Sequence, residues 1–99
     1  MEFIQSKDNK TIKHIIALGQ RKNRQKNGEY IVEGIRSIRD IAAMGAVKTV
    51  VIRESKAQDK NVLDLLTLDS VQSAHTYIVQ DPVFDKIDNT VNGQGVVAI

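Results

Sequence analysis

The residues best suited to chemistry in this 99-residue sequence lie in one polar segment, residues 20–28. The segment has no apolar residue, and its four basic side chains are Arg21, Lys22, Arg24 and Lys26. Basic side chains displace the counterions condensed on phosphates, and the Asn and Gln amides between them can bond to sugar or base edges. The composition predicts contact with a phosphate backbone. The alternative interpretation is a solvated surface loop.

The net charge of the whole chain conceals this segment, because the formal charge is only +2. Residues 1–26 carry a charge of +5, and residues 27–99 carry −3. Such an asymmetry predicts an end that faces a polyanion, attached to an otherwise acidic domain.

The sequence contains no arrangement that indicates catalysis or metal binding. His14 and His75 lie on different predicted elements, and neither has a second ligand at metal-binding spacing. The absence of cysteine excludes disulfides and thiolate chemistry. No serine has the Gly-x-Ser-x-Gly setting of an activated nucleophile, and no glycine-rich loop leads from a strand into a helix. We therefore expect no catalytic residue, no metal and no cofactor site in this chain.

Length and composition predict a single domain over residues 1–99. The 41% hydrophobic and 26% charged residues are typical of a globular chain. No apolar run approaches the roughly 20 residues of a membrane span, and the N-terminus lacks the pattern of a signal peptide. We expect a cytoplasmic protein with no membrane partner.

The elements that position the basic segment are predicted from hydrophobic periodicity and capping residues. Helices are expected over residues 7–18, from residue 35 to Gly45, from Asn61 through Leu66, and from Asp81 through Ile87. Strands are expected over residues 29–34, 48–52, 76–79 and 95–99, the second of them buried on both faces. This alternation predicts an α/β fold: a three-layer α/β/α sandwich with a mostly parallel central sheet of about four strands.

The first predicted helix is amphipathic, with Ser6 as its expected N-cap. Its isoleucines, Ile12, Ile15 and Ile16, are predicted to face the core. The opposite side carries Lys10, Lys13 and His14, so the helix should present a basic outer face next to the basic segment.

Aromatic residues are few, and we expect them to be mostly internal. Phe3, Tyr77 and Phe84 are predicted to lie in the core of so small a domain. Tyr30 follows the basic segment but is expected to pack within the strand over residues 29–34. Stacking on nucleic-acid bases is therefore only a minor expectation.

Three segments, in order along the chain, carry a resemblance to a known family. The family pattern is a helix with Asn and Lys, then Gly-x-aromatic-x-Val-Glu-Gly-x-Arg, and then Thr-x-x-x-Gln-Gly. The matching residues here are Asn9 and Lys13, then Gly28, Tyr30, Val32, Glu33, Gly34 and Arg36, and then Thr90, Gln94 and Gly95. Over essentially its whole length the chain resembles the N-terminal substrate-binding domain of the SpoU/TrmH family of RNA ribose 2′-O-methyltransferases.

The resemblance implies a fold similar to ribosomal proteins that bind kinked RNA, with the chemistry in a second domain. In the family a C-terminal trefoil-knotted domain binds S-adenosylmethionine, supplies a catalytic Arg and forms a homodimer. That domain would begin after Ile99, so we expect this chain to be an N-terminal fragment without catalysis of its own. Two departures from the patterns matter. Gly93 stands where the family usually has Pro, and the Asn of kink-turn binders is missing around Glu33.

The basic segment and the resemblance together predict a structured RNA, ribosomal or transfer RNA, as the partner. The expected RNA-binding residues are Lys10, Lys13, Arg21, Lys22, Arg24, Lys26 and Arg36. Two alternatives remain. One is an interaction module that docks on its own catalytic domain or on a protein partner, and the other is a stand-alone ribosomal-type RNA binder. Glu33 and Arg36 also fit a purely local turn, and the roles of Gln94 and Gly95 are open.

Overall fold

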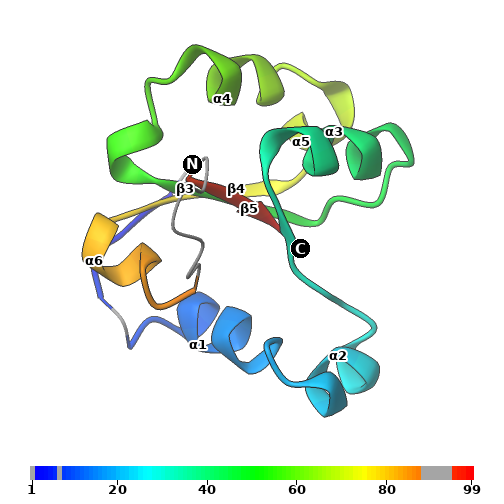
Figure 1. Cartoon of the computed structure of the whole chain (residues 1–99), viewed down its shortest axis with the longest axis vertical. Helices are drawn as coiled ribbons and strands as arrows, with labels where there is room; N and C mark the ends of the chain where they lie inside the picture. The colour runs from blue at the N-terminus through cyan, green and yellow to red at the C-terminus, as the bar shows by residue number, and fades with distance from the viewer. Residues whose placement is uncertain (1, 7, 88–94) are drawn as a thin grey trace.

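The computed structural model of the chain describes residues 2–6, 8–87 and 95–99. Helices and strands alternate along most of it, as Figure 1 shows. In chain order the elements are β1 (Glu2–Ile4), α1 (Lys10–Ala17), α2 (Arg21–Asn27), β2 (Val32–Glu33), α3 (Ile35–Ala43), β3 (Thr49–Arg53), the 3-10 turn η1 (Glu54–Lys56), α4 (Lys60–Leu65), α5 (Asp69–Gln72), β4 (His75–Val79), α6 (Asp81–Phe84) and β5 (Val96–Ala98). The α/β class predicted from the sequence is confirmed.

The strands form one mixed sheet in the order β1-β4-β3-β5-β2. Strands β1 and β3 both run parallel to β4, with Val51 opposite Tyr77 in the register of the central pair. Strand β5 is antiparallel to both of its neighbours, β3 and β2. The prediction of about four strands in a mostly parallel sheet is not confirmed, because there are five strands and half of the pairings are antiparallel.

The direction of β5 follows from where the chain enters it. Helix α6 is only four residues long, so it rises about 6 Å and does not return the chain along the roughly 16 Å of a five-residue strand. Gly95, just before β5, lies beside Arg53 at the end of β3, and the Arg53 N–H donates to its carbonyl at 2.8 Å. The chain thus enters β5 at the end where β3 and β4 finish, and it must run against them.

Strand β1 and helix α5 were not predicted, and one strand is shorter than predicted. β1 and α5 span three and four residues, which is too short for a periodic pattern to be recognised. The strand expected over residues 29–34 is reduced to β2, because only Val32 and Glu33 lie opposite β5.

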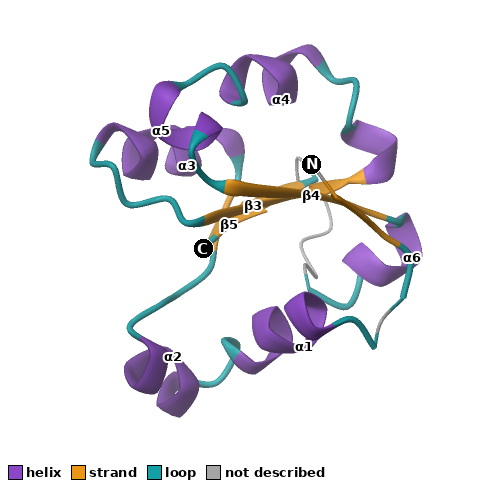
Figure 2. Cartoon of the chain, turned by 180° about the vertical axis from the view of Figure 1, so that it is seen from behind, coloured by secondary structure: helices purple, strands orange, loops and turns teal. Residues whose placement is uncertain are grey.

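The sheet separates two apolar cores. Along β3, Val50 and Ile52 belong to one core and Val51 to the other, as the alternation of side chains along a strand requires. Helices α3, α4 and α5 cover the first face, whereas α1 and α6 cover the second (Figures 1 and 2). The prediction that residues 48–52 form a strand buried on both faces is confirmed.

Helix α2 belongs to neither core. It has no buried residue, and it lies beyond the C-terminal end of α1, away from the sheet (Figure 2). The absence of apolar residues from residues 20–28 predicts an exposed loop or a frayed extension of the first helix. The segment is instead a separate exposed helix that ends at Gly28, whose φ of 65° is left-handed.

Two helices begin at capping residues other than those predicted. Helix α1 begins after Asn9 rather than Ser6, and the Asn9 side chain accepts from the Thr11 N–H at 2.8 Å. Helix α4 begins after Asp59 rather than at Asn61, whose N–H donates to the Asp59 carboxylate. Both caps satisfy backbone donors that the first turn of a helix leaves unpaired.

The predicted core is confirmed in part. Phe84 is fully buried and Tyr77 is half-buried against the α1–α6 side, as expected. Phe3 is 46% exposed because β1 is an edge strand, and Ile16 is equally exposed on α1. The prediction that these last two side chains lie in the core is wrong.

Gly95 occupies a position that only glycine fits. Its φ is 76°, and a Cβ there would lie 2.5 Å from Cγ of Lys56 and 3.3 Å from Cβ of Arg53. The last glycine of the family pattern therefore has a structural reason: it lets the chain pass closely beside η1 as it enters β5. Thr90, Gly93 and Gln94 of the same segment lie outside the described residues.

We expect Gly95→Ala to cost more stability than Gly45→Ala, a matched control. Gly45 has a similar φ of 70° but no atom within 4 Å of an added Cβ. Both variants lose roughly 1–2 kcal/mol through left-handed strain, and Gly95→Ala loses about 1–3 kcal/mol more through the clash. Urea unfolding of the two variants measures the difference. Equal losses would show that the close approach to Lys56 and Arg53 is not a constraint.

Candidate nucleic-acid interface

The basic residues predicted to bind RNA fall on three helices. Lys10 and Lys13 lie on α1, and Arg36 lies on α3, which covers the other face of the sheet. The remaining four, Arg21, Lys22, Arg24 and Lys26, lie on α2. The fold thus gathers six of the seven on two consecutive helices and leaves Arg36 apart from them. We call the exposed members on α1 and α2 the cationic surface: Lys10, Lys13, Arg21, Lys22 and Lys26.

Helix α2 is held in place by polar contacts with the end of α1. The side-chain amide of Asn23 donates to the Ala17 carbonyl at 2.8 Å. Nη1 of Arg24 donates to the carbonyls of Leu18 and Gly19, each at 3.1 Å. These carbonyls lie at the C-terminal end of α1, where the helix dipole favours a positive charge. The Ala17 carbonyl also accepts from the Gln20 N–H at 3.1 Å. Arg24 is half-buried and acts here as a cap, so its contribution is to position α2.

Among the described residues, no carboxylate forms an ion pair with the cationic surface. Neither α1 nor α2 contains Asp or Glu. Among the described residues, the ion pairs involve His14, Lys48 and Arg53, and none includes a Lys or Arg of α1 or α2. The positive charge of these helices is therefore available to an external anion.

Glu29 joins α1 to the start of β3. Its Oε1 lies 2.7 Å from Nε2 of His14, and its Oε2 accepts from Nζ of Lys48 at 2.6 Å. The hydrogen bond from Lys48, followed by that from His14, holds the pKa of Glu29 below its ordinary value of 4.5. The sequence did not predict this contact, because the three residues are 15 and 19 positions apart and no local pattern joins them.

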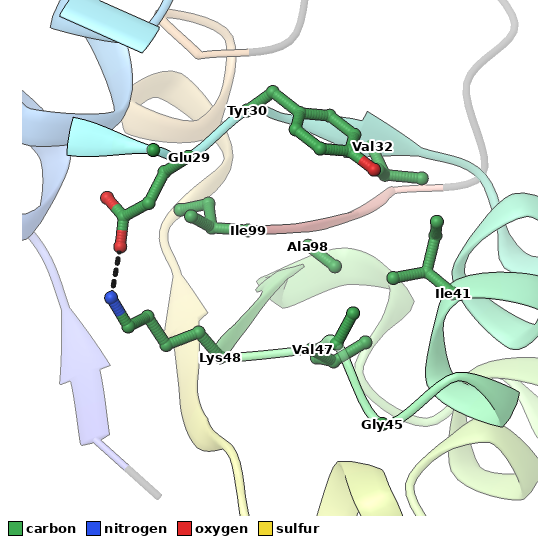
Figure 3. Close-up of a pocket in the computed structure, with 11 residues that line it drawn as sticks. Glu29, Tyr30, Val32, Ile41, Gly45, Val47, Lys48, Ala98 and Ile99 are labelled. Atoms are coloured by element: carbon green, nitrogen blue, oxygen red, sulfur yellow. Dashed lines mark hydrogen bonds and ion pairs between the residues drawn. The ribbon is translucent and has the colours of Figure 1, made fainter. Parts of the chain in front are cut away.

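A hollow of about 350 Å³ opens beside Glu29, between the segment that follows α2 and the end of α3 (Figure 3). Tyr30 and Ile41 form opposite walls, and Ala98 of β5 lies between them (Figure 3). Tyr30 is 56% exposed, so the prediction that it packs within a strand is wrong. The reason is that the strand begins only at Val32.

Another charged cluster lies at the opposite end of β3 and has a structural role. The Arg53 guanidinium pairs with the carboxylates of Asp81 and Asp85 and lies 4.7 Å from the centroid of the Phe84 ring. The hydrogen bonds from Ser55 hold the pKa of Asp81 below its usual range. These contacts fasten α6 to the end of β3.

Metal-binding and membrane-spanning features can be assessed for residues 2–6, 8–87 and 95–99. Within these ranges, no group of three His, Cys, Asp or Glu side chains could hold a metal ion. None of the helices there has the length and apolar character required to cross a membrane.

Two glycines of the family pattern have conformations that the motif requires. Gly28 ends α2 in the left-handed conformation, and its N–H donates to the Arg24 carbonyl at 2.9 Å. Gly34 has a φ of 87° as the N-cap of α3, and its N–H donates to the Val96 carbonyl at 3.3 Å. The motif therefore turns the chain from α2 into β2 and from β2 into α3.

The α/β fold and its two cationic helices define a binding domain. Residues 9–98 match the family of MRM3-like substrate binding domains. Because the match covers nearly the whole chain, the chain belongs to this family. The resemblance to the substrate-binding domains of SpoU methyltransferases is confirmed.

Individual relatives agree with this assignment. A protein of Synechocystis sp. described as an uncharacterized tRNA/rRNA methyltransferase is 33% identical over 95 residues, which is 96% of this chain and 34% of that protein. The crystal structure of an rRNA methyltransferase from Sinorhizobium meliloti aligns with 98% of this chain and 35% of its own, with a TM-score of 0.76 and 24% identity. A structure of an RNA 2′-O ribose methyltransferase aligns with 97% of this chain and 36% of its own, with a TM-score of 0.73 and 20% identity. The two structures show the same fold, and the chain spans about a third of the length of these relatives.

We expect Arg24→Ala to loosen α2 from α1, whereas Lys26→Ala, which removes the same charge from an exposed position, does not. Losing the two hydrogen bonds of Nη1 should lower the local opening free energy by about 1 kcal/mol, so that the α2 amides exchange roughly fivefold faster. Hydrogen exchange followed by NMR measures this rate for each variant. Equal exchange in the two variants would contradict the capping role.

The Glu29 contacts predict a pH-dependent contribution to stability. Because folding lowers the pKa of Glu29, its contribution is present above about pH 4.5 and is lost as the pH falls through the folded-state pKa. Glu29→Gln should therefore lower the free energy of unfolding at pH 7, and its difference from wild type should shrink at pH 3. Urea unfolding at both pH values tests this, with exposed Glu54→Gln as the control. If Glu29→Gln lowers the free energy of unfolding by the same amount at both pH values, the ionised Glu29 carboxylate does not contribute through its contacts with His14 and Lys48.

Proposed function

We propose that this chain is the RNA-binding domain of an S-adenosylmethionine-dependent rRNA or tRNA 2′-O-ribose methyltransferase. The observation that carries the proposal is the cationic surface, whose lysines and arginine have no carboxylate partner among the described residues. The family match and the names of the relatives supply the substrate class. Residues 1–99 form one domain in this proposal, and methyl transfer and dimerisation belong to a separate catalytic domain.

The basic residues have different roles in this proposal, according to their positions in the fold. Arg21, Lys22 and Lys26 contact phosphates from α2, where they form no ion pair with a described residue. Lys10 and Lys13 extend the contact along α1. Arg24 keeps α2 docked on the end of α1, so it acts on RNA binding through the position of the helix.

Arg36 takes a lesser part in the proposal. It lies on α3, in the layer on the other side of the sheet. It contributes only to an RNA that reaches past the edge strand β2.

In this proposal the cofactor binds to the separate catalytic domain, and a chemical argument supports that assignment. S-adenosylmethionine carries a positively charged sulfonium, which the exposed Lys48 ammonium at the rim of the hollow would repel. At the hollow beside Tyr30 the acidic group is Glu29, and Lys48 and His14 already hold both of its oxygens. The residues described there do not fit the cofactor, and we derive no step of methyl transfer from them.

The alternative function is an interaction module in which α2 serves only solubility and the domain docks on a protein. The two functions differ in their response to salt. Phosphate contacts release counterions, so the affinity for RNA must fall steeply as the salt concentration rises. A domain that docks only on a protein would show no steep salt dependence in an RNA-binding measurement.

We expect Arg21→Ala/Lys26→Ala to reduce the salt dependence of RNA binding. The assay is filter binding of a hairpin RNA with an internal loop at salt concentrations of roughly 50 to 200 mM, the range in which phosphate contacts strongly affect affinity. It gives the slope of the logarithm of the binding constant against the logarithm of the salt concentration. Each phosphate contact adds about 0.9 to the slope on a duplex and about 0.7 on a single strand, so the double variant should lose roughly 1.4 to 1.8.

The matched control is Arg39→Ala/Lys60→Ala, which removes one Arg and one Lys from exposed positions on the opposite side of the sheet. It should leave the slope unchanged. A flat wild-type slope, or equal losses in the two double variants, would overturn RNA binding by α2 and favour the interaction module.

A further inference from the structure

Tyr30 is the most exposed aromatic side chain in the described residues. The chain has only four aromatic residues, and Phe84 is fully buried while Tyr30 is 56% exposed. Leaving a large ring in water forgoes the stabilisation that burial would provide, which is a cost for a domain of this size. The exposed ring is available for contact with a ligand.

The ring stands over a partly apolar hollow of a size suited to one small ring system. The volume of about 350 Å³ is at the lower end of the range of sites for small molecules. Figure 3 shows the Tyr30 ring on one side, Ile41 facing it and Val47 on a third side, with Ala98 and Ile99 between them. The hollow thus lies between Tyr30 and Ile41 and is lined largely by apolar side chains.

The charges around the hollow favour an occupant attached to an anionic chain. Gly28, on one wall, immediately follows α2, whose exposed Lys26 is two residues earlier. Glu29, the acidic residue at the rim, is held by Lys48 and His14 and so exerts little repulsion. The Lys48 ammonium is 68% exposed and donates one hydrogen bond to Glu29, which leaves donors for a carbonyl or phosphate oxygen.

We propose that this hollow receives an unpaired base of the bound RNA, which stacks on Tyr30 while α2 holds the neighbouring phosphates. The proposal rests on the proposed function, because the base must belong to an RNA that the cationic surface captures. Every nucleobase has a π-face, so stacking on Tyr30 selects for an unpaired nucleotide with little preference for its identity. The site would thus distinguish a looped or bulged RNA from a continuous duplex.

The test compares two hairpin RNAs of equal length, one fully paired and one with a single unpaired uridine in the stem. Wild-type chain should bind the bulged hairpin at least about fivefold more tightly, the lower bound for stacking of one base. Tyr30→Leu should abolish this preference and keep the salt slope, whereas Tyr30→Phe, which keeps the ring, should retain the preference. Phe3→Leu, which removes an exposed aromatic ring on the other edge of the sheet, should retain it as well.

A direct measurement on the unmodified chain accompanies the variants. With 5-iodouridine at the bulge, ultraviolet irradiation should form a cross-link that mass spectrometry locates at Tyr30. A cross-link elsewhere, an absent preference in wild type, or a preference that survives Tyr30→Leu would overturn the base site. If the affinity of the wild-type chain for RNA is also independent of salt, the proposed RNA-binding function is wrong as well. If the slope is intact, only the base site fails.

Discussion

Strand β3 must be buried on both faces, and this requirement arranges the rest of the domain. Val50, Val51 and Ile52 are fully or almost fully buried, so apolar helices have to cover each side of the sheet. Helices α3, α4 and α5 satisfy one side, and α1 and α6 satisfy the other. Helix α2 has no apolar residue to offer to either core. It is therefore left at the surface, with its charges directed to solvent.

A helix without an apolar face needs another means of attachment. Asn23 and Arg24 provide it by donating to three consecutive carbonyls at the end of α1. The same solution explains why the remaining α2 cations have no ion-pair partner within residues 2–6, 8–87 and 95–99: the docking uses backbone oxygens rather than carboxylates. The domain thereby presents its positive charge on a folded helix, which suits an anionic partner better than a charged loop that must first become ordered.

The segment that follows α2 connects this surface with the sheet. Gly28 ends the helix, Glu29 ties the segment to α1 and β3, and Tyr30 projects beside the hollow before β2 begins at Val32. Because β2 pairs through only two residues, Tyr30 is outside the ladder and its ring remains exposed. A short strand thus creates the feature on which the base-binding proposal depends.

The sequence alone determined the α/β class, the buried central strand, the amphipathic first helix and the position of the basic residues along the chain. Each of these follows from local periodicity or composition. Only the tertiary structure decided the direction of β5, the capping role of Arg24, the contacts of Glu29 with two distant side chains and the exposure of Tyr30. These depend on which distant segments meet: β5 runs backward because its entry lies beside Arg53, and Glu29 finds partners 15 and 19 residues away. No local sequence pattern encodes these long-range contacts, because they form only when the helices pack on the sheet.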